Sequence, residues 1–381
     1  MENKKHKILF ILLLGLLSLS LIQHIFPFLP EKKLRGDIQE VAFPKWSFSD
    51  FYSGKYSAEI DNYIQHHFGL HSWAIRLDNQ IEYSFFNKAK ANGVIIGKHN
   101  YLYENKYIDA YYGKDFVGSD SVQLQIRKLQ AVRDTLRKLD KDIWVIFLPG
   151  KASLVPENIP DTHRSTFEAQ SNYSVYKQEI EKAGIPFLDL RALFLEWKDK
   201  SVYPLFPKLG IHWSEMAEIF AMQQMGYFAQ KQLGEPLPQL EIKMTPPVHA
   251  SFGRDNDIAE AMNLLIPIQS EVLVYPEYSY TADTSAKNKV LVIGDSFYFG
   301  PFSKHFSRII FGNGAFWYYN RMAYQFEKEE LDLNGIDKKS QWENHDKICL
   351  IMTEVNYPKF GFGFVEEAYN RYYGTKGASI K

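Results

Sequence analysis

The stretch KVLVIGDSFYFG, residues 289–300, decides the fold. Its residues 290–293 are all apolar, and a short run that is apolar on both faces is typical of a strand in a parallel sheet covered by helices. Gly294 follows, and glycine adopts backbone angles that other residues take only at a cost. We therefore expect a tight turn that holds the hydroxyl of Ser296 clear of the sheet.

The same alternation of strands and helices continues on both sides of this stretch. Doubly apolar strands are predicted in DIWVIFLPGKAS (142–153), IPFLDL (185–190) and KICLIMTE (347–354), and helices over residues 122–139, 172–183 and 214–232. Such repetition predicts an α/β fold with a parallel sheet and helices on both faces. Residues 235–288 are rich in proline and polar side chains, so we expect them to decorate the active-site side.

Before this region, residues 92–105 alternate around a Gly-Lys-His-Asn turn, as a hairpin does, and residues 56–86 show helical spacing. The histidines at 66, 67 and 71 have no acidic or cysteine partner that would complete a metal site, so we expect no metal. The single cysteine, Cys349, excludes a disulfide framework and a zinc cluster. A net charge of −1 with well-mixed signs argues against a nucleic-acid binder.

The N-terminus predicts a membrane anchor. Residues 8–28 form an apolar run of about twenty residues, the length that crosses a bilayer as a helix. The lysines before it favour a cytoplasmic tail over residues 1–7, and no small-x-small cleavage site follows, which favours a retained anchor over a removed signal peptide. We expect a connector and N-terminal helical region over residues 29–90 and a catalytic domain over residues 91–381.

Catalytic groups gather beyond the carboxyl ends of parallel strands. Ser296 is therefore a candidate nucleophile, with Gly294 and Asp295 shaping the turn and its oxyanion donors; the alternative is a serine that only caps a helix. His212, in GIHWS, is the candidate base; the alternative is a histidine packed beside Trp213.

Several carboxylates are candidates for the acid that would orient His212. Glu354 ends the strand in ICLIMTE and is the preferred acid. Asp295 is expected to hold the turn, while Glu215 and Asp189 are weaker options. Lys151, in the loop after another strand, lies on the same sheet edge, and no catalytic step is assigned to it.

These motifs carry a family resemblance. GDSF after an apolar strand, with HWS upstream, resembles the SGNH-hydrolase-like domain of bacterial polysaccharide O-acetylation proteins of the AlgJ and AlgX type. GVIIGKHNYLYE, WVIFLPGKASLVPENIP, RDNDIAEAMNLL and ICLIMTEVN support it in order across residues 92–356. The resemblance implies Ser296 as nucleophile and His212 as base. The family's Asp-x-His motif is broken here, because Gly210 stands at the aspartate position.

The resemblance implies a membrane-anchored, extracytoplasmic O-acyltransferase, most simply an O-acetyltransferase, that modifies a cell-surface or exported polysaccharide. Its partners would be the polysaccharide acceptor and a membrane-bound O-acyltransferase that supplies acyl groups, with no cofactor. The chain would then be a single-pass protein of the cell membrane, with its catalytic domain in the periplasm of a Gram-negative cell. Two alternatives remain: an SGNH-type carbohydrate acetylesterase, and a non-catalytic scaffold or glycan-binding component of an export and acetylation complex.

Overall fold

The computed structural model describes residues 2–36 and 41–374. Residues 37–40 of the expected connector and residues 375–381 of the expected catalytic domain lie outside the described residues. The chain divides into two compact units, one comprising Met1–Val94 with Ile258–Ile268 and the other Ile95–Asp257 with Gln269–Lys381.

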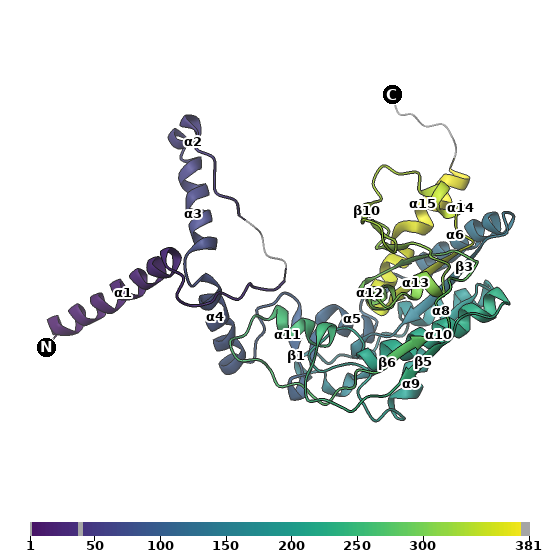
Figure 1. The fold of residues 1–381 in the computed structure, drawn as a ribbon, viewed down its shortest axis with the longest axis horizontal. Helices are drawn as coiled ribbons and strands as arrows, with labels where there is room; N and C mark the ends of the chain where they lie inside the picture. The colour runs from purple at the N-terminus through teal and green to yellow at the C-terminus, as the bar shows by residue number, and fades with distance from the viewer. Residues whose placement is uncertain (1, 37–40, 375–381) are drawn as a thin grey trace. The chain divides into compact units, whose positions relative to one another are not determined.

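The larger unit is built around a central sheet flanked by helices (Figure 1). The sheet has seven strands, in the order β10-β9-β8-β7-β11-β3-β4. The five strands from β8 to β4 run parallel, and β9 and β10 extend one edge antiparallel. The strands are β3 (Asp142–Leu148), β4 (Phe187–Asp189), β7 (Val290–Gly294), β8 (Phe316–Tyr318), β9 (Met322–Tyr324), β10 (Leu331–Asp332) and β11 (Lys347–Thr353). This is the predicted α/β fold with a mostly parallel sheet.

Helices cover both faces of the sheet. On one face, Ile143, Val145 and Phe147 of β3 pack in a core with α6 (Ser119–Arg137), α8 (Asn172–Lys182) and α15 (Phe364–Tyr373). On the other face, Trp144 of β3 meets Phe228 of α10 (Glu215–Leu233) edge to face at 5.6 Å. Because both faces are covered, every residue of β7 is buried, which explains its uninterrupted apolar run.

The remaining elements of the larger unit are short and mostly lie in loops between strands. The helices are α5 (Asn105–Tyr112), α7 (Lys151–Leu154), α9 (Leu190–Lys198), α12 (Phe299–Ser303), α13 (Phe306–Ile309) and α14 (Lys338–Glu343). The 3₁₀ segments include η4 (Gly253–Asn256), η5 (Ser296–Tyr298) and η6 (Glu354–Gly363). The strand pair β5 (Leu240–Lys243) and β6 (Glu277–Tyr280) is antiparallel, and β1 (Val94–Ile96) pairs with β2 (Leu102–Glu104).

The smaller unit is helical. It contains α1 (Glu2–Ile25), α2 (Phe48–Tyr52), α3 (Lys55–His67) and α4 (His71–Phe86). The helix predicted over residues 56–86 is therefore broken, because Leu70 adopts a left-handed backbone with φ of 73° and caps α4. Within α1, Lys4–Ile25 is long and apolar enough to cross a membrane, with a mean hydropathy of 2.4 over its most apolar window. A removable signal sequence has the same properties, so length and composition do not distinguish the two.

The expectation that Gly294 is needed for unusual backbone angles is wrong. Gly294 is the last residue of β7 and has no positive φ. Instead, a Cβ there would lie 3.1 Å from the carbonyl oxygen of Ile351 on the neighbouring strand β11. Glycine is therefore favoured by close strand packing rather than by its backbone angles.

Candidate functional site

Ser296 begins η5, directly beyond the carboxyl end of β7. The turn is held by Asp295, which is buried and accepts hydrogen bonds from the N–H of Phe297 at 3.1 Å and the N–H of Thr353 at 2.8 Å. Thr353 ends β11, so the turn that carries Ser296 is tied to the next strand of the sheet. In the described part of the chain no group accepts a hydrogen bond from the N–H of Ser296. That N–H therefore remains available for a ligand oxygen.

His212 lies against this turn, although it comes from a loop 84 residues earlier in the chain. Its Nε2 lies 3.0 Å from Oγ of Ser296. Its ring also packs on the ring of Phe297, with 4.7 Å between the centroids. The histidine follows a buried loop and precedes α10, which Ser214 caps. The loop and the aromatic contact together fix where the imidazole points.

The carboxylate that contacts His212 belongs to Asp257, the first residue of α11 (Asp257–Ala261). Its Oδ2 lies 2.6 Å from Nδ1 of His212, and its Oδ1 accepts the N–H of Ile211 at 2.9 Å. This arrangement assigns the ring proton to Nδ1 and leaves Nε2 free to accept the proton of Ser296. Ser296, His212 and Asp257 thus form a connected chain of hydrogen bonds with the geometry of a nucleophile, a base and an orienting acid.

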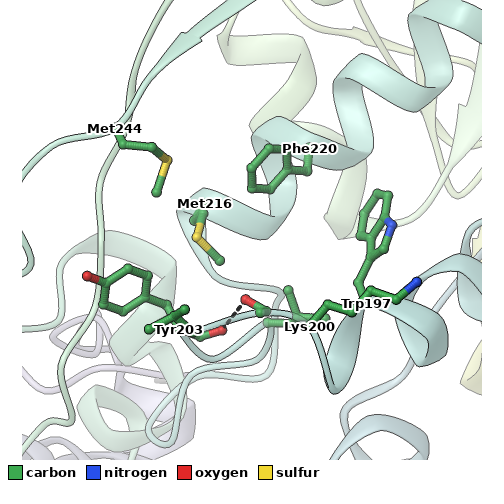
Figure 2. A pocket seen from close by; sticks show the side chains of 9 residues that line it. Trp197, Lys200, Tyr203, Met216, Phe220 and Met244 are labelled. Atoms are coloured by element: carbon green, nitrogen blue, oxygen red, sulfur yellow. Dashed lines mark hydrogen bonds between the residues drawn. The ribbon is translucent and has the colours of Figure 1, made fainter.

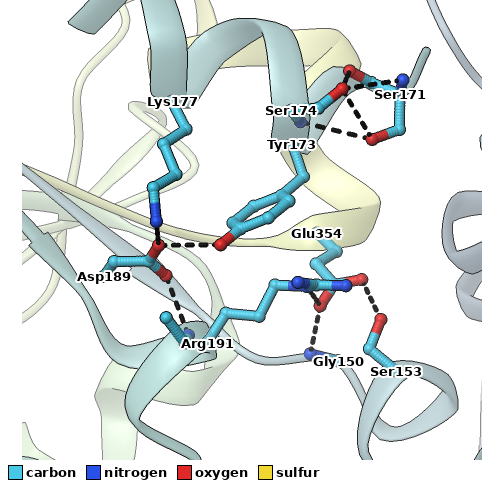
Figure 3. A network of polar contacts seen from close by, with 10 residues as sticks. Gly150, Ser153, Ser171, Tyr173, Ser174, Lys177, Asp189, Arg191 and Glu354 are labelled. Atoms are coloured by element: carbon cyan, nitrogen blue, oxygen red, sulfur yellow. Dashed lines mark hydrogen bonds and ion pairs between the residues drawn. The ribbon is translucent and has the colours of Figure 1, made fainter. Parts of the chain in front are cut away.

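The expectation that Glu354 orients His212 is wrong. Glu354 is buried elsewhere, in the polar network of Figure 3. Its Oε1 accepts from Nε of Arg191 at 2.7 Å and from the N–H of Gly150 at 3.2 Å, and its Oε2 accepts from the hydroxyl of Ser153. The guanidinium of Arg191 lies over the ring of Tyr173 at 4.0 Å. Glu354 therefore joins the ends of β3 and β11 to α7 and α9, and both of its oxygens are occupied.

The other two acids considered also have different partners. Asp189 accepts hydrogen bonds from the hydroxyl of Tyr173 at 2.8 Å and from Lys177 at 2.6 Å, as Figure 3 shows. Glu215 pairs with Lys304 at 2.9 Å. Neither carboxylate contacts His212.

The structure also explains the glycine at position 210. A Cβ there would overlap the carbonyl oxygen of Arg254 and lie 2.9 Å from the carbonyl carbon of Asp255. The segment that carries Asp257 therefore occupies the space that a side chain at position 210 would need. With residues 254–257 on this path, there is no room for an acidic side chain at position 210, two residues before His212.

The same segment brings Arg254 into contact with Ser296. Its Nη1 donates to the carbonyl oxygen of Ser296 at 2.8 Å, and its guanidinium lies over the ring of Phe299 at 5.8 Å. Arg254 and Asp257 were missed as site residues because they lie in the polar region 235–288. The signal was present in RDND, where several charged residues stand just before a helix.

Lys151 is fully buried and supports the loop before His212. Its ammonium donates to the carbonyl oxygens of Leu102 at 2.6 Å, Lys208 at 3.0 Å and Gly210 at 2.8 Å. Burial lowers the pKa of Lys151 to about 7, although the nearby carboxylates of Glu271 and Asp257 act in the opposite direction. With three acceptors around it, the protonated form is the one that satisfies every contact. The lysine therefore holds the path of residues 208–210.

A separate cavity of about 420 Å³ lies beside the start of α10 (Figure 2). It is lined mainly by aromatic and methionine side chains, among them Trp197, Tyr203, Met216, Phe220 and Met244. Ser296, His212 and Asp257 do not line it. Its apolar walls carry none of the chemistry described above.

Comparisons with known proteins identify the family of the chain. Residues 94–305 match the family model described as SGNH hydrolase-like domain, acetyltransferase AlgX. The chain is also 23% identical over 162 residues to a probable alginate O-acetylase AlgJ of Azotobacter vinelandii, covering 42% of this chain. That match spans 40% of the length of the relative.

Two solved structures are similar. The O-acetyltransferase domain of Pseudomonas putida AlgJ has a TM-score of 0.48 and 13% identity, covering 73% of this chain and 99% of that domain. Pseudomonas aeruginosa AlgX has a TM-score of 0.46 and 13% identity, covering 81% of this chain and 72% of the other.

Proposed function

Because the chain belongs to the family of SGNH hydrolase-like domains of the acetyltransferase AlgX, we propose that it is a polysaccharide O-acyltransferase, most simply an O-acetyltransferase. We assign Ser296 as its nucleophile, His212 as its base and Asp257 as the acid that orients the base. The observation that carries this proposal is the 3.0 Å separation between Oγ of Ser296 and Nε2 of His212. A serine is activated when a neighbouring base can accept its proton.

The first half-reaction loads the enzyme. Oγ of Ser296 attacks the carbonyl carbon of the acyl donor while its proton moves to Nε2 of His212. Asp257 stabilises the resulting imidazolium, and the free N–H of Ser296 donates to the oxyanion. When the intermediate collapses, the bond to the donor's leaving group breaks and that group takes the proton from His212. The products are an acyl-serine ester and the protonated leaving group.

The second half-reaction transfers the acyl group. A hydroxyl of the acceptor sugar gives its proton to Nε2 of His212 and attacks the ester carbonyl. Oγ of Ser296 leaves and takes the proton back, so the free enzyme and an acylated sugar remain. Water in place of the sugar gives an acetylesterase with the same residues, since the two activities differ only in the acceptor.

We further propose that α1 is a retained anchor that holds the enzyme at the outer face of the membrane. Its apolar segment Lys4–Ile25 is long enough to span a bilayer. Anchoring would bring Ser296 close to a membrane-bound O-acyltransferase that supplies acyl groups from the cytoplasmic side. The acceptor would be a cell-surface or exported polysaccharide.

One assay distinguishes a transferase from an esterase. The full chain in detergent is incubated with an aryl acetate carrying a labelled acetyl group, with and without an oligosaccharide acceptor. A transferase deposits label on the sugar, and Ser296→Ala abolishes both the label and the release of the phenol. Hydrolysis that no acceptor alters would reject the transferase assignment, and unchanged activity in Ser296→Ala would reject the nucleophile.

A further inference from the structure

The exposed side of α4 carries a stripe of large apolar side chains. Trp73, Leu77, Ile81 and Phe85 stand four residues apart, so they lie along one side of the helix. Their exposed fractions are 37%, 52%, 42% and 79%, respectively. A helix on the surface of a soluble domain normally turns such a stripe toward the core. In the described part of the chain, this apolar stripe stays exposed instead.

The polar side of α4 is the one that packs against the protein. Arg76 is buried, and its guanidinium donates hydrogen bonds to the carbonyl oxygens of Lys33 at 3.1 Å and Leu264 at 3.3 Å. Asn79 donates to the carbonyl oxygen of Met262 at 2.8 Å. All of these partners belong to the smaller unit. The packing therefore holds the apolar stripe outward, because rotating the helix would break these hydrogen bonds.

The neighbouring helices leave apolar side chains uncovered as well. Within the described residues, neither α2 nor α3 contains a buried side chain. Phe43, Trp46, Phe51 and Tyr52 are each more than half exposed. Residues 43–86 expose as many large apolar side chains as the described part of the larger unit, which is several times longer. Exposed apolar surface of this extent marks a contact with another protein or with a membrane.

The contacts of α4 with α1 favour the membrane. Gly69, just before α4, accepts a hydrogen bond from the hydroxyl of Ser20 in α1 at 2.6 Å. The N–H of Leu70 donates to Glu31, a few residues beyond the end of α1, at 2.8 Å. With Lys4–Ile25 across a bilayer, these contacts place the start of α4 where the chain leaves the lipid. Figure 1 shows α3 and α4 running across the direction of α1 rather than alongside it, as helices on a membrane surface do.

We propose that α4 lies in the interface of the membrane, with the apolar stripe of Trp73, Leu77, Ile81 and Phe85 among the lipid headgroups and the upper part of the acyl chains. This inference rests on the proposed retention of α1 as an anchor. Helices that bind in this way insert their apolar side about 5–10 Å deep, and tryptophan is enriched at this level of a membrane. The lipid contact would hold the smaller unit in one orientation on the membrane, which a single spanning helix leaves free to rotate.

A nitroxide label reports what surrounds the apolar stripe. Leu77→Cys is labelled in the full chain, in nanodiscs of phosphatidylethanolamine and phosphatidylglycerol, and the native Cys349 is buried and does not compete. Collisions of the label with O₂, which concentrates in lipid, are compared with collisions with a water-soluble nickel chelate. The matched control is Leu124→Cys in α6, since Leu124 is 46% exposed and Leu77 is 52% exposed. We expect the label at position 77 to lose most of its access to nickel and keep its access to O₂, and the label at position 124 to remain accessible to nickel.

Leu12→Cys, within the apolar segment of α1, reports on the anchor independently. If the label at position 12 is shielded from nickel while the label at position 77 is as accessible as that at position 124, the inference is overturned and the anchor stands. Loss of access to both reagents at position 77 would also overturn it, because a protein surface, such as a second copy of the chain, would then cover the stripe. Nickel reaching position 12 would reject the anchor and the inference together. Aryl-acetate hydrolysis by the labelled chains tests the catalytic assignment separately.

Discussion

At the scale of single residues, the carboxylate of Asp257 controls which nitrogen of His212 carries the proton. One oxygen accepts from Nδ1 of the ring and the other from the N–H of Ile211, so the carboxylate fixes both the ring and the backbone beside it. Glu354 also uses both of its carboxylate oxygens in hydrogen bonds, but its partners are Arg191, Ser153 and Gly150. The two acids therefore should fail in different ways when they are neutralised.

We predict that Asp257→Asn lowers kcat by roughly 10²–10⁴-fold with little change in Tm, because the amide favours the wrong tautomer of His212. Glu354→Gln should instead lower Tm, because it leaves the charge of the partly buried Arg191 without its partner, while the folded fraction keeps most of its kcat. Aryl-acetate kinetics and thermal melts on both variants distinguish the outcomes. A large loss of kcat in well-folded Glu354→Gln, with Asp257→Asn active, would reverse the assignment.

Asp255 gives a pH-dependent prediction. Burial raises the pKa of Asp255 from 3.8 to about 7, and the nearby carboxylates of Glu215 and Glu218 add to the effect, while the hydroxyl of Tyr275 opposes it. Both glutamates are paired with Lys304. Because the folded state holds this proton more tightly than the unfolded chain, the stabilisation is complete below 3.8 and is lost as the pH rises through about 7.

We therefore expect Asp255→Asn, which stays neutral, to raise Tm relative to the wild type at about pH 8, and to raise it less at about pH 5. Thermal melts at the two pH values test this. Tyr275→Phe serves as a control that removes the neighbouring hydroxyl and keeps the titrating group. A Tm difference that does not change with pH would show that Asp255 is already ionised in the folded protein.

At the scale of elements, the path of residues 253–257 determines which residue can supply the acid. Its backbone fills the space beside Gly210, and Lys151 holds the carbonyl of Gly210 at 2.8 Å from the other side. The loop that presents His212 is thus confined between a buried ammonium and a backbone segment. An aspartate at position 210 has no room unless residues 254–255 move.

We predict that Gly210→Asp does not rescue Asp257→Asn and by itself lowers both Tm and activity, because backbone atoms must shift to admit its side chain. Gly210→Ala should show a smaller effect of the same sign. Melts and aryl-acetate kinetics on the two single variants and the double variant check this. Recovery of kcat in Gly210→Asp/Asp257→Asn would show that the acid can be supplied from either position.

Much of this arrangement follows from local sequence patterns. The apolar runs now seen as β3, β7 and β11 are buried on both faces, so their pattern indicated the sheet. Ser296 and His212 follow recognisable motifs, and they do meet at 3.0 Å. Asp257 was not singled out in this way, because its contact with His212 joins residues 45 apart that are separated by α10 and β5. Glu354 directly follows the central strand β11, but the position of the strand did not reveal that Arg191 is the partner of this carboxylate.

At the scale of the whole molecule, the remaining question is whether α1 stays attached to the chain. Within the smaller unit, the hydroxyl of Ser20 donates to the carbonyl oxygen of Gly69 at 2.6 Å. A Cβ at Gly69 would overlap the backbone of Ser20 and lie 3.1 Å from the carbonyl carbon of Gln23. Gln23 is itself buried, and its side chain bonds the backbone of Phe28 and Leu29. These contacts join α1 to later residues of the same unit, which a signal peptide removed after export does not need.

We therefore predict that the mature chain keeps residues 1–28, fractionates with the membrane and resists extraction by salt or alkali, and that deleting these residues releases it. Intact mass of the purified chain and membrane fractionation provide the measurement. Gly69→Leu gives a sharper test, because its side chain would meet the backbone of α1. The substitution should lower the stability of the full chain and leave the stability of the chain lacking residues 1–28 unchanged. Ala91→Leu, at a position outside the helices of this unit, is the matched control. Two results would assign the helix as a removed signal peptide. One is an intact mass that corresponds to a chain starting after residue 25, and the other is an equal loss of stability on Gly69→Leu with and without α1.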